Sequence, residues 1–150
     1  MSRIDFYHLQ RQPLEEVLPK LLEKAYSTGQ KVLVRIGNEE LVEFINSHLW
    51  TYNDQSFLPH GSKKDGNSEI QPIWLTSGTD NPNQAQLLFL VDNADISMEE
   101  LDNYARVFNI FDGHSEDALD HARSLWKEIK KTTHQCHYWK QDDQGKWQEA

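Results

Sequence analysis

The chain has 150 residues, 37% of them hydrophobic and 26% charged, and its 24 acidic against 15 basic side chains give a formal net charge of −9. This length suits one domain, residues 1–150, with a sizeable core. The negative charge argues against general attraction to nucleic acid, so we do not expect a direct nucleic-acid reader. No apolar run approaches the roughly 20 residues that a membrane-spanning helix needs. The start MSRIDFYHLQ lacks the apolar core of a secretory signal, and the single cysteine, Cys136, cannot form an intramolecular disulfide, so we expect a cytoplasmic protein.

The first third of the chain alternates strand and helix patterns. Residues 4–10 and 31–36 have strand character, and each is followed by apolar residues at helical spacing. These spacings predict helices over residues 14–28 and from about Asn38 to His48, with Asn38 as the N-cap of the second. The inward-facing stripe of that second helix should consist of Leu41, Phe44, Ile45, His48 and Leu49.

The middle of the chain begins with its most irregular stretch, residues 51–72. The content of Gly, Pro, Ser, Asn and Asp there predicts a loop that contains at most a short edge strand. Strands are predicted over residues 73–77 and 86–92. Because the second of these is apolar on both faces, it should be a central strand of a parallel sheet.

The last third continues the alternation. Residues 97–104 predict a short helix opened by a capping box between Ser97 and Glu100. A two-sided strand over 105–112, a helix over 115–131 and a β-hairpin over 136–149 follow. This order of elements predicts a three-layer α/β sandwich with a mainly parallel central sheet and a Rossmann-like topology.

The loops that would bind phosphate in such a fold are missing. The turn after the first predicted strand, QRQP, has no glycine, and the turn after the second has only Gly37. Neither a P-loop nor the G-x-G-x-x-G pattern occurs, so close approach of backbone N–H groups to a phosphate is obstructed. Nucleotide binding therefore stays an alternative that depends on fold analogy alone.

No catalytic constellation or metal cluster emerges from the motifs. The segment HQCH, residues 134–137, offers two imidazoles and a thiol, but no second cysteine completes a familiar zinc set. We interpret it as a polar loop leading into a strand. The sequence predicts no catalytic residue, no metal site and no cofactor.

The predicted helix over 115–131 offers a binding surface. Its buried stripe should consist of Ala118, Ala122, Leu125 and Ile129. Arg123 and Lys127 lie one turn apart on another face, Trp126 lies between them, and Lys130 and Lys131 follow. The cluster is equally consistent with a helix that obeys its dipole and with a cationic cleft for a carboxylate and an apolar side chain.

A second candidate surface lies where the second helix ends. Large apolar residues crowd into a stretch that otherwise reads as loop, namely Trp50, Tyr52, Phe57, Leu58 and Pro59. Some of them should be core. A protein interface is the other interpretation, because aromatic residues are enriched at interfaces.

The segments FYHL, KVLVRIGNEELVEFINSHLW, SFLPH and ARSLWK, in this order and spacing, resemble the chi subunit family of bacterial DNA polymerase III holoenzyme. The resemblance spans essentially the whole chain. It implies an α/β fold without a nucleotide site and a non-catalytic accessory subunit of the clamp-loader complex. It also implies binding of the acidic C-terminal tail of single-stranded DNA-binding protein, which couples the replicase to coated template.

The resemblance also implies site residues. The tail-binding residues map to Arg123, Trp126 and Lys127, although chi proteins have Tyr where Trp126 stands. A family lysine one turn before Arg123 is Leu119 here, and Lys130 or Lys131 could replace it.

The family's contact with the psi subunit maps to Trp50 and Phe57, with Pro59 shaping the same patch. The sequence thus supports two hypotheses from different classes: an adaptor that binds an acidic peptide, and a nucleotide-binding module or nucleotide-dependent enzyme on a similar fold. The second requires a phosphate loop that the sequence lacks.

Overall fold

The structure is a computed structural model, and it describes residues 2–52 and 58–150. Its strands are β1 (Arg3–Leu9), β2 (Val32–Ile36), β3 (Gly61–Ser62), β4 (Ile73–Thr76), β5 (Leu87–Val91), β6 (Arg106–Asp112), β7 (Gln135–Gln141) and β8 (Trp147–Glu149). Its helices are α1 (Leu14–Tyr26), α2 (Glu39–Thr51) and α3 (Glu116–Lys130), with short 3₁₀ turns η1 (Ser68–Ile70) and η2 (Glu100–Asn103).

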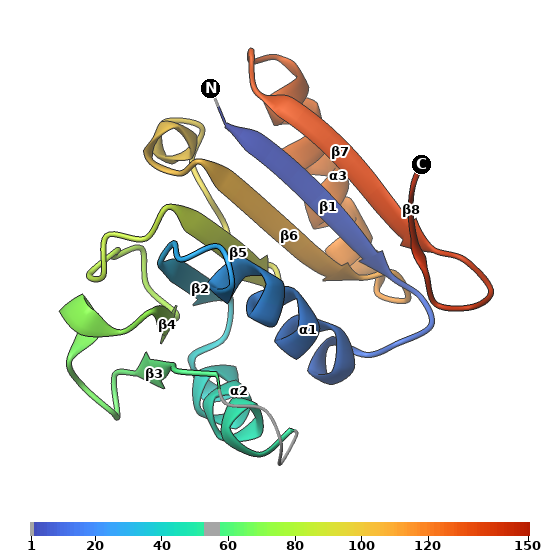
Figure 1. Cartoon of the computed structure of the whole chain (residues 1–150). Helices are drawn as coiled ribbons and strands as arrows, with labels where there is room; N and C mark the ends of the chain where they lie inside the picture. Colours follow the sequence, from blue (N-terminus) through green and yellow to red (C-terminus); the bar gives the residue numbers. More distant parts are fainter. Residues whose placement is uncertain (1, 53–57) are drawn as a thin grey trace.

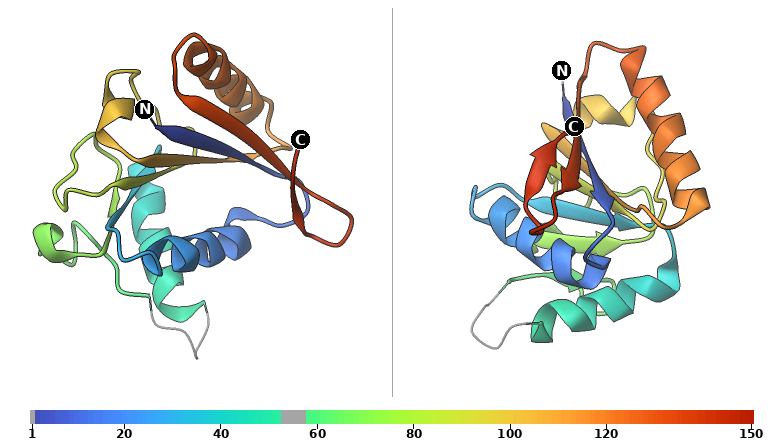
Figure 2. Two further views of the ribbon diagram at one scale, coloured as in Figure 1. Left: turned by 45° about the horizontal axis from the view of Figure 1, so that its top comes forward. Right: turned by 90° about the vertical axis from the view of Figure 1, so that its right-hand side faces the viewer.

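One eight-stranded sheet organises these elements. Its strand order is β3-β4-β2-β5-β6-β1-β7-β8, and every neighbouring pair is parallel except the C-terminal hairpin β7–β8. Helices α1 and α2 cover one face, and α3 and η2 cover the other (Figures 1 and 2). The predicted three-layer α/β sandwich with a mainly parallel sheet is confirmed.

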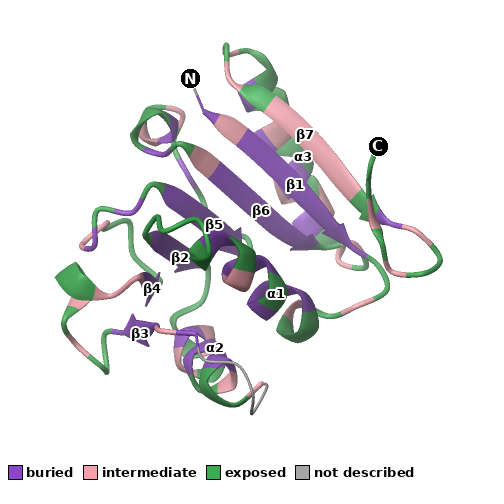
Figure 3. Cartoon of the chain, viewed as in Figure 1, coloured by how far each residue is buried: buried purple, intermediate pink, exposed green. Residues whose placement is uncertain are grey.

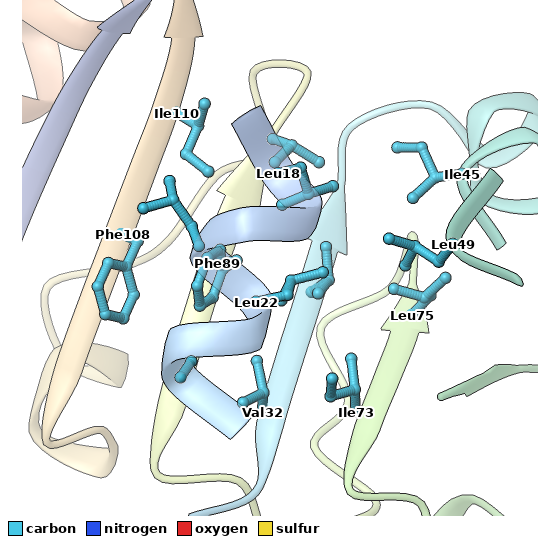
Figure 4. Packing of buried hydrophobic residues seen from close by; sticks show 14 of the residues in the cluster. Leu18, Leu22, Val32, Ile45, Leu49, Ile73, Leu75, Phe89, Phe108 and Ile110 are labelled. Carbon is cyan, nitrogen blue, oxygen red and sulfur yellow. The ribbon is translucent and has the colours of Figure 1, made fainter. Parts of the chain in front are cut away.

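The core forms two layers on the two faces of this sheet. In β5, Leu87, Phe89 and Val91 face the α1 side, whereas Leu88 and Leu90 face the α3 side. The strand is buried along its whole length because helices cover both faces, as its unbroken apolar run predicts. Figure 4 shows α1 lying over β5 and β2. Burial decreases toward the C-terminal edge, where β7 is mostly half-buried (Figure 3).

The packing of helix α2 shows that the prediction of an inward-facing Phe44 is wrong. Asn38 caps it as predicted, accepting a hydrogen bond from the backbone N–H of Glu40 (3.0 Å). Phe44, however, points to solvent with 54% of its surface exposed, whereas Val42 and Asn46 are buried. Of the other predicted stripe residues, Ile45 and Leu49 are buried, and Leu41 and His48 are half-buried.

The reason lies in the segment that follows α2. The amide nitrogen of Asn46 donates to Asp65 (2.9 Å) and to Ser62 in β3 (3.3 Å). Contact with this segment brings Asn46 inward and leaves the Phe44 side of the helix uncovered. The short edge strand predicted in this irregular region is the two-residue β3.

The short helix predicted over residues 97–104 is a 3₁₀ turn, η2. Its capping box is present: the Ser97 N–H donates to the Glu100 carboxylate (3.1 Å), and the Glu100 N–H donates to the Ser97 hydroxyl (3.2 Å). The same carboxylate accepts from buried Arg35 of β2 (2.9 Å). The ion pair therefore links η2, at the surface of the molecule, to β2 in the central sheet.

Gly37, the single glycine of the β2–α2 turn, is required by backbone packing. A Cβ atom there would lie 1.8 Å from the carbonyl oxygen of Asp92, in the turn that follows β5. The Gly37 N–H also donates to the carbonyl of Val91 (3.1 Å). Two turns at the carboxyl ends of adjacent strands therefore press together where a Rossmann-type protein would hold phosphate.

Candidate functional site

The best candidate site is a groove between α3 and β7, here called the α3 groove. Its volume is about 420 Å³. It is lined by Phe6, His8, Phe111, Leu119, Ala122, Arg123, Trp126, Lys127, Tyr138 and Lys140. The residues come from β1, β6, α3 and β7, so the groove exists only once the sheet has formed.

The apolar part of the α3 groove is built around Trp126. The buried stripe of α3 is as predicted, with Ala118, Ala122, Leu125 and Ile129 all buried. Trp126 follows Leu125 and therefore lies at the edge of the helix–sheet contact, half-buried. Its ring makes edge contacts with Phe6 of β1 (centroids 5.2 Å apart) and Tyr138 of β7 (6.0 Å). These contacts hold the indole in place beside the open part of the groove.

Three cations surround this apolar surface. Arg123 and Lys127 are exposed on successive turns of α3, and Lys140 rises from β7 on the opposite wall. Arg123 makes a 3.4 Å contact with Asp120, but both side chains are largely exposed (68% and 74%), so solvent screens the pair. The ammonium of Lys140 lies 5.9 Å from the centre of the Tyr138 ring. The groove thus offers positive charge on both walls of a molecule with net charge −9.

Beneath the cations, His8 and Tyr138 form a polar floor. The Nδ1 atom of His8 and the Tyr138 hydroxyl lie 2.6 Å apart. Burial, together with the nearby charge of Lys140, lowers the pKa of His8 below its ordinary value, so the ring is neutral at pH 7. Burial raises the pKa of Tyr138, so its hydroxyl keeps its proton. Gly113 makes room for this pair, since a Cβ there would lie 2.1 Å from His8 Nε2.

The predicted tail-binding residues divide into two groups. Arg123, Trp126 and Lys127 all line the groove. Lys130 does not line it, but its ammonium lies 5.1 Å from the Trp126 ring centre. Lys131 follows as the C-cap of α3 and is outside the lining.

The contribution of β7 to the α3 groove was not predicted from the sequence. Leu119, at the position of the family lysine, lines the groove, and the third cation is Lys140. Tyr138 and Lys140 pair with Phe6 and His8 of β1 in parallel register, which directs them to the α3 side. Alternation within the segment CHYWKQ could have placed Tyr138 and Lys140 on one face, but not which helix covers that face.

Comparison with known proteins assigns the family. A family model described as "DNA polymerase III chi subunit, HolC" matches residues 1–137. The chain is also 31% identical over 136 residues to a protein of Rickettsia prowazekii (strain Madrid E) named "Probable DNA polymerase III subunit chi". That alignment covers 90% of this chain and 82% of the relative. The chain belongs to the DNA polymerase III chi subunit family.

Membership makes this chain an accessory subunit of a replicative DNA polymerase, as the resemblance implied. In this chi-family chain, Arg123, Trp126 and Lys127 lie inside the matched range, whereas Tyr138, Lys140 and β8 lie beyond it. One wall of the α3 groove therefore comes from the part of the chain that the family model does not reach.

The second predicted surface is only partly described. Trp50, at the end of α2, has 46% of its surface exposed, and its ring lies 4.1 Å from that of buried His60. The ring nitrogens of His60 lie 2.7 and 2.9 Å from the carbonyl oxygens of Leu58 and Asn46, which anchors the ring beneath Trp50. Pro59 is half-buried. Phe57 lies outside the described residues.

Both histidines of the HQCH segment make hydrogen bonds to other residues of the protein. His134 Nδ1 accepts from the N–H of Ser2 (2.9 Å), and His137 pairs with Glu149 of β8 (2.6 Å). Burial raises the pKa of the Cys136 thiol. Across residues 2–52 and 58–150, no group of three or more His, Cys, Asp or Glu side chains is arranged to hold a metal ion. Within the same ranges, no helix is long and apolar enough to cross a membrane.

Proposed function

We propose that this chi-family chain is a non-catalytic adaptor of the clamp-loader complex that binds the acidic C-terminal tail of single-stranded DNA-binding protein in the α3 groove. Such binding would couple the replicase to coated template. The observation that carries the proposal is the meeting of three exposed cations around a partly open indole in an otherwise acidic protein. This composition suits a ligand with a terminal carboxylate and a neighbouring apolar side chain.

Each groove residue has a distinct part in the proposed complex. Arg123 presents a planar guanidinium that can donate two parallel hydrogen bonds to the terminal carboxylate. Lys127 and Lys140 act as point charges for acidic side chains on either side. The apolar side chain of the tail enters beside Trp126, against Leu119.

The alternative, a nucleotide-binding module, has less support. The only glycine in the β2–α2 turn is Gly37, and the carbonyl oxygen of Asp92 occupies the space beside it, where a phosphate would have to approach. At the corresponding end of the sheet the cavity lining contains the carboxylates of Asp92, Asp112 and Glu15 and the guanidinium of Arg11. The carboxylates outnumber this fixed positive charge, which disfavours a phosphate.

We further propose that Trp50, Phe57 and Pro59 meet the psi subunit of the clamp loader. The support is the exposed indole of Trp50 at the end of α2, held over an anchored His60 ring. Large aromatic side chains that are partly exposed and held by their neighbours are typical interface anchors. Replacing Trp50 by Ala should abolish co-purification with psi while leaving tail binding unchanged.

The adaptor proposal is tested by titrating the protein with a labelled peptide that copies the C-terminus of single-stranded DNA-binding protein from the same organism. We expect a Kd of about 1 μM, equivalent to about −8 kcal/mol. Arg123→Ala and Lys127→Ala should each weaken binding about tenfold or more, because each removes a charge-assisted contact. Affinity should also fall as salt is raised.

Two controls make this titration specific. Lys20→Ala removes an exposed lysine from α1, on the other face of the sheet, and should bind like the wild type. An amidated peptide should bind more weakly if Arg123 meets the terminal carboxylate. Binding that ignored both the α3 substitutions and amidation would contradict the proposal.

A further inference from the structure

A second groove lies on the opposite face of the sheet, between α1 and the C-terminal hairpin, and is here called the α1 groove. Its volume is about 650 Å³. It is lined by Arg3, Tyr7, Leu21, Lys24, Ala25, Thr28, Gln30, Leu87, Ala105, Arg106, Phe108, Trp139 and Trp147. Helix α1 lies over β5 and β2 (Figure 4). Among residues 2–52 and 58–150, no helix lies in front of the first halves of β6, β1 and β7 on this face (Figure 1).

Aromatic rings form the floor and one wall of the α1 groove. The Tyr7 ring is nearly parallel to those of Phe108 and Trp139, with centroids 6.3 Å apart in each case. Trp147 of β8 stands perpendicular to Tyr7 at 5.0 Å. Both indoles are half-buried, so part of each ring is open to the groove.

A buried carboxylate fixes two guanidinium groups at one end of this aromatic surface. Asp5 is fully buried and accepts hydrogen bonds from Arg106 Nε (2.8 Å), from Arg3 (3.1 Å) and from the Trp139 indole N–H (2.9 Å). The guanidinium of Arg106 also lies 4.6 Å from the Phe108 ring centre. Asp5 therefore holds both arginines and one indole in a single arrangement.

The groove keeps a positive excess after this pairing. Arg106 uses only Nε toward Asp5, and among the described residues no hydrogen bond is found for its two terminal nitrogens. Lys24, in the last turn of α1, adds a third cation to the lining. Three cations against one carboxylate leave a local charge of about +2.

We propose that the α1 groove binds a short stretch of single-stranded nucleic acid. The free nitrogens of Arg106, with Arg3 and Lys24, contact phosphates, and bases pack against the open parts of Trp139 and Trp147. Paired cations and aromatic surfaces are the combination that single-strand binders use. Membership in a family of DNA polymerase subunits makes such a ligand available. The acidity of the remaining surface limits the contact to this groove and makes it weak and salt-sensitive.

The proposal is tested by fluorescence anisotropy of a fluorescein-labelled oligothymidine at low salt. We expect saturable binding by the wild type. Lys24→Ala should weaken it and lower the slope of log affinity against log salt by about one. Trp147→Leu should weaken it about tenfold through lost stacking. Lys24 is exposed and is not among the hydrogen-bond partners of Asp5, so its replacement should leave the fold intact.

Controls separate this groove from the α3 groove. Lys127→Ala should bind oligothymidine like the wild type, although it loses the acidic peptide. Loss of oligothymidine binding in Lys127→Ala but not in Lys24→Ala would place nucleic acid in the α3 groove and overturn the proposal. So would the absence of saturable binding, or binding of an acidic peptide that depends on Lys24 in place of the oligonucleotide. The first two outcomes leave the proposed binding of the tail in the α3 groove untouched, whereas an acidic peptide that required Lys24 would count against that proposal as well.

Discussion

Two glycines illustrate how single residues acquire their roles from distant neighbours. Gly37 accommodates the carbonyl of Asp92, and Gly113 accommodates the ring of His8 in the floor of the α3 groove. Neither has a positive φ angle, so the requirement is for space and not for backbone freedom. In the sequence, Gly37 is only the single glycine of a turn that lacks a phosphate-binding pattern.

Substitution of Gly37 tests this packing. Gly37→Ala should lower the free energy of unfolding by about 1–3 kcal/mol, because a methyl group would overlap a backbone carbonyl that cannot rotate away. Urea denaturation measures the change. Gly78→Ala is the matched control: its Cβ would come closest to the carboxylate end of the flexible Asp80 side chain (2.9 Å) and lie at ordinary contact distance from Thr76 Oγ1 (3.6 Å), so it should change stability little. Equal effects of the two substitutions would contradict the close approach of the turns.

At the scale of elements, α2 shows how a helix can obey its period and still be rotated away from the expected face. Phe44 fits the apolar spacing as well as Ile45 does, yet only Ile45 is buried. The decisive contact is Asn46 with β3 and the turn after it. A polar residue thus determined which apolar residues of α2 face inward.

The orientation of α2 predicts that substitutions of two adjacent residues change the unfolding free energy by very different amounts. Ile45→Ala should cost about 2–5 kcal/mol of unfolding free energy, because it opens a cavity in the core. Phe44→Ala should change stability by less than about 0.5 kcal/mol, because the ring is exposed. Thermal or urea unfolding of both variants measures this difference. A large loss in Phe44→Ala would mean that the helix is rotated as the sequence alone predicted.

At the scale of the whole molecule, carboxylates tie the sheet to its surroundings and make stability depend on pH. Burial by itself would raise the pKa of Asp5, but hydrogen bonds from Arg106, Trp139 and Arg3 outweigh it and lower the pKa. For Glu100 the same opposition holds, and bonds from Ser97 and Arg35 lower the pKa. A lowered folded-state pKa stabilises the protein above the unfolded-state pKa of about 4, and this contribution is lost as the pH falls through the folded-state value.

Replacing Glu100 tests this dependence. Glu100→Gln should cost about 1–3 kcal/mol of unfolding free energy at pH 7, because Arg35 is left buried without its carboxylate. The cost should shrink as the pH falls through the folded-state pKa of Glu100, which lies below its ordinary value, because the wild-type carboxylate then becomes protonated. Urea unfolding at pH 7 and at a series of falling pH values measures the change, with exposed Glu99→Gln as the control. A cost that stayed constant with pH would show that the charge of Glu100 does not contribute.

The sequence by itself determined the order of elements, the sandwich and the buried stripe of α3, because periods of 3.6 and 2 residues are local properties that a short window of chain displays. It also placed Arg123, Trp126 and Lys127 on one helix. Only the tertiary structure decided that Lys140 faces them across a groove. The cause is the position of β1 between β6 and β7: this strand order brings α3 and the start of the hairpin to the same face, and no local pattern encodes which strands become neighbours.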